Sequence, residues 1–278
     1  TDFGVAFNTS IHFNKNEVTD LGGLPPIPIF GRNYSTGWTG QRHAEGFPLG
    51  SVFLPRVLSA DIQGTGLAAR AVNIMCESGP IVLAGTMMTR GGGAAVPCTS
   101  GETAPEVYMG ATVPTREISF NTTVTWRGNT RFYTDFQYAG GHIMVDGITA
   151  ASHLFFRNTK AIHEKTDPIL LGYDELGEVN QSGIFDAGQL TLRSVSVSHT
   201  FGGDLAAKLG ADRLNLTLSG QNLWKVWRAQ SEAFGHKIVD SEVRDSGYTS
   251  TSPGGISAYT QDGFPIFKRF LATMRVTF

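Results

Sequence analysis

Residues 117–138, EISFNTTVTWRGNTRFYTDFQY, contain the clearest indication of the fold class. Apolar residues alternate with polar ones on both sides of Gly128, so that Phe120 and Phe132 fall at even positions while Asn121 falls between them. A period of two is the side-chain period of a β-strand, which gives each strand one apolar and one polar face. Gly128 and Asn129 predict a two-residue turn, because glycine readily adopts positive φ. The stretch therefore predicts an antiparallel hairpin.

The same alternation recurs in four further segments and brings the number of predicted strands to six. These segments are residues 5–13, 190–201, 213–219 and 269–278. In residues 190–201 the apolar positions change from even to odd between Leu192 and Val195. A one-residue β-bulge at Arg193 or Ser194 would return both halves to one face of the strand. The chain is therefore predicted to be all-β and antiparallel.

The connections between these strands are alternately long and short. In chain order they are residues 15–115, the turn at 128–129, residues 141–186, residues 202–211 and residues 221–264. Outer-membrane β-barrels have this asymmetry, with short periplasmic turns and long extracellular loops. Trp126, Phe201 and Phe278 would then share one rim, where aromatic belts lie at membrane interfaces. The pattern thus favours transmembrane barrel strands.

The composition of the chain and the motifs it lacks argue against several classes of function. Charged residues make up 17% of the chain, below the average of about 25% for soluble proteins. The formal net charge of -2 leaves no basic patch for nucleic acid. The seven histidines have no metal-ligand spacing, and no G-x-S-x-G motif is present. Acidic residues at 135, 174, 175 and 178 lack partners for acid/base work, so we predict no enzyme, catalytic residue, metal or cofactor.

Several residues are singled out for structural or binding roles. Cys76 and Cys98 lie in one long connection and predict a possible disulfide in an oxidising compartment, although two unrelated thiols would give the same pattern. Polar positions predicted to face a lumen, for substrate or for internal salt bridges, are Arg127, Arg131, Asp135, Gln137, Arg213, Arg269 and Arg275. Positions predicted to face lipid or to act as an assembly signal are Phe270, Met274, Val276 and Phe278.

A series of motifs resembles the C-terminal barrel of SusC-like (SusC/RagA-type) TonB-dependent outer-membrane receptors. The motifs are NKNEVTDLGGLPPI at 14–27, AEGFPLGSVFLPRVL at 44–58, FNTTVTWRGNTRFYTDFQYAGG at 120–141, LRSVSVSHTF at 192–201, AAKLGADRLNLTLSGQNLW at 206–224 and ATMRVTF at 272–278. The resemblance extends over nearly the whole chain. It lacks one element, an Asp-rich stretch before the hairpin, where this chain has its glycine-rich, cysteine-bearing segment.

The resemblance implies that residues 1–278 are the C-terminal part of a 22-stranded barrel in the outer membrane of a Gram-negative bacterium. Neither a plug domain nor a TonB box is recognisable in this sequence. The implied activity is TonB-energised import of a bulky nutrient, which is an oligosaccharide, a peptide or a chelate. Implied partners are the rest of the receptor chain, the TonB complex, a SusD-like lipoprotein lid, the barrel-assembly machinery and the lipid bilayer.

Two other classes of protein fit the alternation. A soluble, secreted β-sandwich binding module would bury the apolar faces in a dry core between two sheets. A complete small outer-membrane barrel acting as a pore or adhesin would need about eight strands. Its additional strands would come from the long connections, at GFPLGSVFLPRVLSAD (46–61) and GHIMVD (141–146).

Overall fold

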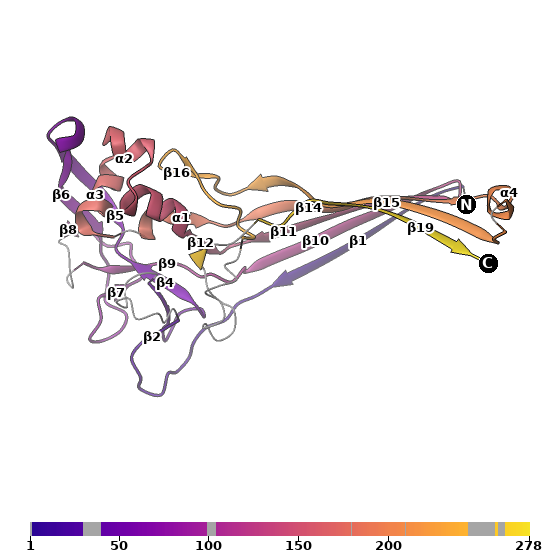
Figure 1. The fold of residues 1–278 in the computed structure, drawn as a ribbon. Helices are drawn as coiled ribbons and strands as arrows, with labels where there is room; N and C mark the ends of the chain where they lie inside the picture. The colour runs from indigo at the N-terminus through magenta and orange to yellow at the C-terminus, as the bar shows by residue number, and fades with distance from the viewer. Residues whose placement is uncertain are drawn as a thin grey trace.

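The computed structural model of the chain describes residues 2–29, 40–98, 104–178, 180–208, 210–243, 259–260 and 265–278. It contains a long antiparallel sheet and, at one end of that sheet, a loop domain built from the described parts of residues 14–114, 141–188 and 229–243 (Figure 1). Both chain termini and the short helix α4 (Gly203–Ala207) lie at the opposite end of the sheet. The loop domain and the two chain termini are therefore separated by the length of the strands.

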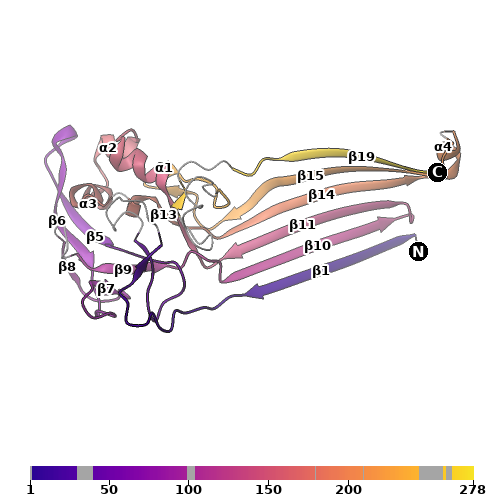
Figure 2. The same ribbon diagram turned by 60° about the horizontal axis from the view of Figure 1, so that its bottom comes forward.

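The sheet consists of the six predicted strands, which run side by side in the order β1-β10-β11-β14-β15-β19 (Figure 2). Their bounds are β1 Phe3–Phe13, β10 Arg116–Trp126, β11 Thr130–Gly140, β14 Gln189–Phe201, β15 Arg213–Arg228 and β19 Arg269–Thr277. All five pairings are antiparallel. The all-β, antiparallel prediction is confirmed, and β15 extends further than the alternation indicated.

The pairing register joins the apolar positions of the strands into one face. Phe120 pairs with Thr9 on one side and with Phe136 on the other, and Phe136 pairs in turn with Leu192. Toward the other edge, Leu218 pairs with Val197 and with Ala272. Directly paired residues project to the same side of a sheet, so the alternation of each strand adds to a continuous apolar face. The opposite face is polar.

Two local irregularities decide the details of this register. Asp135 pairs with Ser194 and Phe136 with Leu192, which leaves Arg193 unpaired and confirms the predicted bulge. The hairpin turn is different from the prediction, because Trp126 pairs with Thr130 and the loop has the three residues 127–129. Arg127 has φ 52° and shares the left-handed conformation with Gly128. The turn therefore starts one residue early, and Arg127 lies in the loop and not on the polar face of a strand.

The long connections carry the other elements. The first contains β2 Ile27–Pro28, β3 Gln41–His43, β4 Ser51–Leu54, β5 Val57–Gln63, η1 Gly66–Ala68, β6 Arg70–Glu77, β7 Met88–Thr89, β8 Ala95–Pro97 and β9 Glu106–Gly110. The second contains β12 Ile143–Asp146, α1 Gly147–Ala150, the π-helical turn η2 Ala151–Phe155, α2 Lys160–Glu164, α3 Pro168–Leu176, η3 Asn180–Gly183 and β13 Ile184–Asp186. The third contains β16 Glu232–Ala233, β17 His236–Lys237 and β18 Tyr259–Thr260.

The additional strands that a small barrel would need do form, but they pair elsewhere. β4 and β5 lie within residues 46–61, and β12 lies at residues 143–146. Each belongs to a small sheet of the loop domain and none pairs with the six-stranded sheet. Among the described residues they therefore do not enlarge that sheet toward a closed barrel.

The hydrophobic core of the described chain lies in the loop domain. Its largest cluster joins the first connection, through Val57 and Cys76, to the second, through Leu154 and Leu170. Helix α3 supplies four residues of this cluster, and both of its ends are capped. The Asp167 carboxylate accepts hydrogen bonds from the backbone N–H groups of residues 169 and 170, at 2.9 and 3.0 Å, and Gly177 ends the helix at φ 73°.

The apolar face of the sheet is uncovered along most of its length. Phe7 is 68% exposed, Leu218 54% and Phe270 78%. Soluble proteins rarely expose a contiguous apolar surface of this kind, and when they do it marks an interaction site. In the part of the chain that is described, every helix is too short or too polar to cross a bilayer.

Candidate functional site: a polar cavity between the sheet and the loop domain

A cavity of about 740 Å³ lies where the polar face of the sheet reaches the loop domain. The strands supply Ser10 and His12 from β1, Glu117 and Ser119 from β10, Gln137 from β11 and Gln189 from β14. These are alternate positions of the strands, so the period of two places them on one side. Ser241 and Glu242 close the cavity from the third connection.

Residues 238–243, which we call the clasp segment, fold back over this polar face and are held there by ion pairs. The Glu242 carboxylate contacts both Arg193 and Lys225, and Lys225 Nζ lies 3.2 Å from Asp240 Oδ1. The four side chains are only 11–24% exposed. Two cations and two anions therefore neutralise each other where solvent screens them weakly.

Amide and hydroxyl groups complete the cluster. Arg193 Nε donates to Gln137 Oε1 at 2.7 Å, and Lys225 Nζ donates to Gln189 Oε1 at 2.8 Å. The Ser241 hydroxyl donates to the same Gln189 oxygen. Arg193 is the unpaired residue of the bulge, which lets its side chain reach both Gln137 on β11 and Glu242 on the clasp segment. The bulge is thus the local feature that builds the site.

The charge interaction at the rim of the cavity is weaker than the ion pairs that hold the clasp segment. His12 and Glu117 are direct partners across β1 and β10, and His12 Nδ1 lies 3.6 Å from Glu117 Oε2. Both side chains are more than half exposed, so their mutual attraction is small. Within the described part of the chain, no group of three or more histidine, cysteine or acidic side chains is arranged to hold a metal ion. The arrangement is suited to binding a polar molecule through hydrogen bonds and charge.

Only one of the predicted lumen-facing residues lines this cavity. Gln137 lies in it, while Asp135 lies on the same face of β11 and accepts a long hydrogen bond from Ser119 Oγ at 3.4 Å. The arginines on the strands share that face by register but are spread along the sheet: Arg131 opposite Ser198, Arg213 opposite Thr277, Arg269 opposite Gln221 and Arg275 opposite Asn215. Arg127 lies in the hairpin loop with its guanidinium 4.8 Å from the ring centroid of Trp126.

The C-terminal residues lie as follows. Phe270, Met274 and Val276 pair with Gly220, Leu216 and Leu214, on the apolar face. Phe278 follows β19 and is 82% exposed. Whether these residues meet lipid or an assembly factor stays a prediction.

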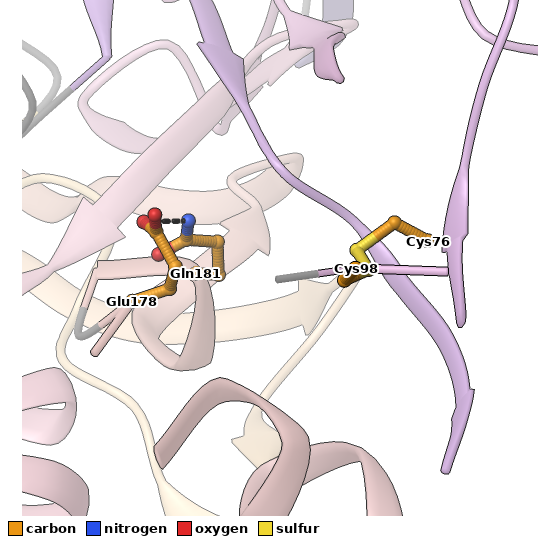
Figure 3. Close-up of a disulfide and its surroundings, with 4 residues drawn as sticks. All are labelled: Cys76, Cys98, Glu178 and Gln181. Carbon is orange, nitrogen blue, oxygen red and sulfur yellow. Dashed lines mark hydrogen bonds between the residues drawn. A yellow bond between two sulfur atoms is a disulfide. The ribbon is translucent and has the colours of Figure 1, made fainter. Parts of the chain in front are cut away.

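The loop domain contains the two cysteines and three of the four acidic residues that were considered for acid/base work. Cys76 of β6 and Cys98, which follows β8, are bonded to each other with their Cα atoms 5.5 Å apart (Figure 3). Gln181 Nε2 donates to the Glu178 carboxylate, and burial raises the pKa of Glu178 (Figure 3). Asp174 is paired with Arg157 at 2.5 Å. Asp174 and Glu175 belong to helix α3 and Glu178 follows it, away from the lining of the cavity.

The sequence did not point to the four charged residues that hold the clasp segment on the sheet, which are Arg193, Lys225, Asp240 and Glu242. A signal existed for Arg193, because the change of parity marks it as a bulge residue. Lys225 stood out weakly as the lone charge in the run LWKVW. Asp240 and Glu242 had no signal, since their partners are defined only by the folding back of the chain.

The fold is similar to that of several solved structures over the whole of this chain. One, described as the structure of the RagAB peptide transporter, matches with a TM-score of 0.66 at 16% identity. The RagAB peptide importer in its "closed-closed" state gives 0.64 at 17%, and in its "open-open" state 0.61 at 15%. The chain is therefore similar in fold to part of one chain of these structures.

All of this chain is covered in each comparison, but only 27–28% of the other. The chain therefore spans just over a quarter of the length of the proteins it matches. No protein-family model and no curated protein matches the sequence. The similarity to the RagAB structures thus shows that this antiparallel β fold is shared with part of those structures, and it leaves function to be argued from the site.

Proposed function

We propose that this chain is the C-terminal part of an outer-membrane, TonB-energised importer of the SusC/RagA type, which takes up a bulky nutrient. The main support for the proposal is that the six-stranded sheet exposes a continuous apolar face. In addition, the whole of this chain matches structures that are described as importers or transporters. In a bilayer this face would be covered by lipid, which removes its apolar surface from water. The polar face would then line the path of the substrate.

Strand geometry is consistent with a membrane-spanning role. β10 and β11 each have 11 residues, which extends them about 36 Å at about 3.3 Å per residue. A strand of that length, tilted by about 45°, spans the apolar band of about 25 Å in a transmembrane barrel. The free edges of β1 and β19 would pair with further strands of the receptor, because unpaired backbone groups in lipid cost several kcal/mol each.

In this proposal the substrate passes over the polar cavity and the clasp segment. The RagAB structures are of a peptide importer, and the paired charges of the clasp are compatible with a peptide, an oligosaccharide or a chelate. The loop domain stands at the end of the sheet where a lipoprotein lid would bind. TonB would act through a part of the receptor outside this sequence.

The proposal is tested by immunoblotting outer-membrane fractions with an antibody raised against the loop domain. We expect the antigen to resist a urea wash and to migrate well above 29.9 kDa, as part of a plugged receptor. An antigen that urea removes would instead identify the soluble β-sandwich. An antigen that stays in the membrane at 29.9 kDa would identify the small barrel.

The importer role is tested separately by deleting the gene and comparing growth on peptides, oligosaccharides and metal chelates as limiting nutrients. We expect a growth defect on one class only, restored by the native gene. A variant with Arg193→Gln and Glu242→Gln keeps a polar, uncharged side chain at both positions and removes the Arg193–Glu242 ion pair, so reduced growth would locate passage at the clasp segment. Unchanged growth of the deletion strain on all three classes would contradict the proposal.

A further inference from the structure

Another cavity, of about 320 Å³, lies within the loop domain. One of its walls comes from residues 21–26, which directly precede β2, and the other from residues 83–86, which lie between β6 and β7. Glu45 completes the lining, so we call this cavity the Glu45 pocket. It shares no lining residue with the polar cavity and is therefore a separate candidate site.

Two glycine-containing turns form the walls, and hydrogen bonds hold each of them in place. In the first, the Leu24 N–H donates to the Leu21 carbonyl at 3.3 Å across two glycines of positive φ. In the second, the Thr86 hydroxyl donates to the Leu83 carbonyl at 2.8 Å. Leu83 also packs against the buried cluster around Phe47. The Glu45 pocket is therefore formed before any ligand enters it.

The carboxylate of Glu45 is directed to the first wall but has no cation beside it. Its Oε1 accepts a hydrogen bond from the Leu21 N–H at 2.7 Å, while its Oε2 accepts none from the described residues. Glu45 is half-buried, and none of the ion pairs formed by the described residues includes it. Arg90 contacts the two residues after it instead, donating to the Gly46 carbonyl at 2.7 Å and lying 4.1 Å from the centroid of the Phe47 ring.

Most other side chains of the Glu45 pocket are hydrocarbon. They belong to Leu21, Leu24, Pro25, Pro26, Leu83 and Ala84. A purely apolar ligand would cover the Glu45 carboxylate without pairing its charge, which is costly, and an anionic ligand would be repelled by it. A ligand with a hydrocarbon stem and a cationic end satisfies both parts of the lining, as the side chains of lysine and arginine do.

The hydrogen bonding of Glu45 favours lysine over arginine. A guanidinium group pairs best with a carboxylate through both oxygens at once. Because Oε1 already accepts from the Leu21 N–H, one oxygen is left for a ligand. A single ammonium group, which acts as a point charge on a flexible four-carbon stem, matches that arrangement.

We propose that the Glu45 pocket binds the side chain of a lysine, with its stem between the two turns and its ammonium group on Glu45 Oε2. The lysine belongs to a peptide or to a protein that docks on the loop domain, and the chemistry of recognition is the same for both. The inference goes beyond the proposed function, because the pocket lies within the loop domain and does not require the sheet to span a bilayer.

The test uses the native membrane protein that contains this chain, purified in detergent. The probe is an end-capped alanyl-lysyl-alanine tripeptide with a photoreactive diazirine in the lysine stem, and labelled peptides are identified by mass spectrometry after irradiation. We expect label on peptides that cover residues 21–26 and 83–86. The unlabelled lysine tripeptide should compete at least about tenfold better than the norleucine tripeptide, which has the same stem without the ammonium group, because a hydrogen bond to a charged group contributes that much affinity.

Two variants form a matched pair. Glu45→Gln keeps an oxygen for the Leu21 N–H and removes the charge, so the labelling should fall about tenfold. Glu17→Gln removes an exposed charge of the same connection outside the pocket and should leave the labelling unchanged. Limited proteolysis of each variant shows first that the loop domain is folded, and the competition between the two tripeptides in the native protein needs no variant at all.

A carbodiimide, which joins a carboxylate to an amine in contact with it, identifies the source of the lysine. Native membranes are treated with the reagent, and the peptide that contains Glu45 is analysed for the lysine joined to it. A lysine of another protein would identify a docked partner, and coupling to the added tripeptide alone would identify a free peptide. A lysine of the same chain would overturn the proposal, because the receptor would then fill its own pocket.

Equal labelling of the native protein and Glu45→Gln would also overturn the proposal, as would equal competition by the lysine and norleucine tripeptides or label outside both walls. Release of the protein from membranes by a urea wash would contradict the proposed function and leave the Glu45 pocket unaffected. The two claims can therefore fail separately.

Discussion

The six-stranded sheet and the loop domain use apolar residues in opposite ways. In the loop domain such residues are buried, as Leu170 is at 0% exposure in a cluster that a disulfide also joins. In the sheet they stand exposed, as Phe7 and Phe270 do at 68% and 78%. The loop domain is therefore organised like a water-soluble protein. The sheet is organised for surroundings that cover its apolar face from outside the chain.

The largest expected difference comes from truncating a leucine in each region. Leu170→Ala should destabilise the loop domain by about 2–5 kcal/mol, because it leaves a cavity in a closed core. Leu218→Ala on the sheet should cost much less, since no protein core surrounds that side chain. Hydrogen exchange of the two regions in the membrane-embedded protein measures both effects. Equal losses would mean that the sheet also has a packed core.

A charge on the apolar face provides the next largest effect. Phe120→Arg, in the middle of β10, should cost roughly 2–4 kcal/mol if the face lies in lipid near the bilayer midplane. Asn121→Arg, its neighbour on the polar face, should be mild. Denaturant titration of the protein folded into lipid vesicles gives the free energy of unfolding of each variant. Similar costs for the two substitutions would contradict the assignment of the faces.

Removing the disulfide should affect the loop domain only. Cys76 and Cys98 are separated by 22 residues, and cross-links that close loops of this size stabilise by about 3 kcal/mol. We expect reduction, or the double substitution to serine, to loosen residues 57–98 toward limited proteolysis. The strands of the sheet should keep their protection. A sheet that becomes protease-sensitive at the same time would show that the two regions unfold together.

The smallest effect is a dependence on pH in the loop domain. His153 is fully buried, and its Nδ1 lies 2.8 Å from Thr159 Oγ1. Burial lowers the pKa of His153 below 6.5, and the neighbouring His236 lowers it further. The unfolded chain therefore binds the proton more readily, so stability should be fully present above about pH 6.5 and fall as the pH drops below it.

We expect the protection of β16 and β17 to decrease between pH 7.5 and pH 5, because Phe234 and His236 pack against the His153 ring. Hydrogen exchange of the hairpin at a series of pH values measures this. His153→Asn should flatten the profile, whereas His163→Asn, at an exposed position of α2, should leave it unchanged. An unchanged profile in His153→Asn would assign the pH dependence to another group.

The sheet could be predicted from the sequence because its signals are local. The alternation of apolar and polar residues, as at Phe120 and Asn121, predicts which face of the sheet each side chain lies on. The change from even to odd apolar positions beside Arg193 predicts the bulge. The hairpin loop was misplaced by one residue because Arg127 adopts a left-handed conformation usually left to glycine. The core of the loop domain had no such signal, since Val57 meets Leu170 only after two connections have packed together. The ion pair between Glu242 and Lys225 likewise forms only when distant parts of the chain have folded together.

If the chain spans a membrane as proposed, one face of the sheet lies in lipid and the other in a polar interior. Single spin labels placed in turn at residues 117–125 of β10, in the membrane-embedded protein, distinguish the two faces. Paramagnetic relaxation by oxygen reports lipid, and relaxation by a water-soluble nickel chelate reports water. We expect oxygen accessibility to peak at residues 118, 120, 122 and 124, and accessibility to the chelate to peak at the residues between them. Equal accessibility at neighbouring positions, or peaks of the chelate at both sets, would contradict it.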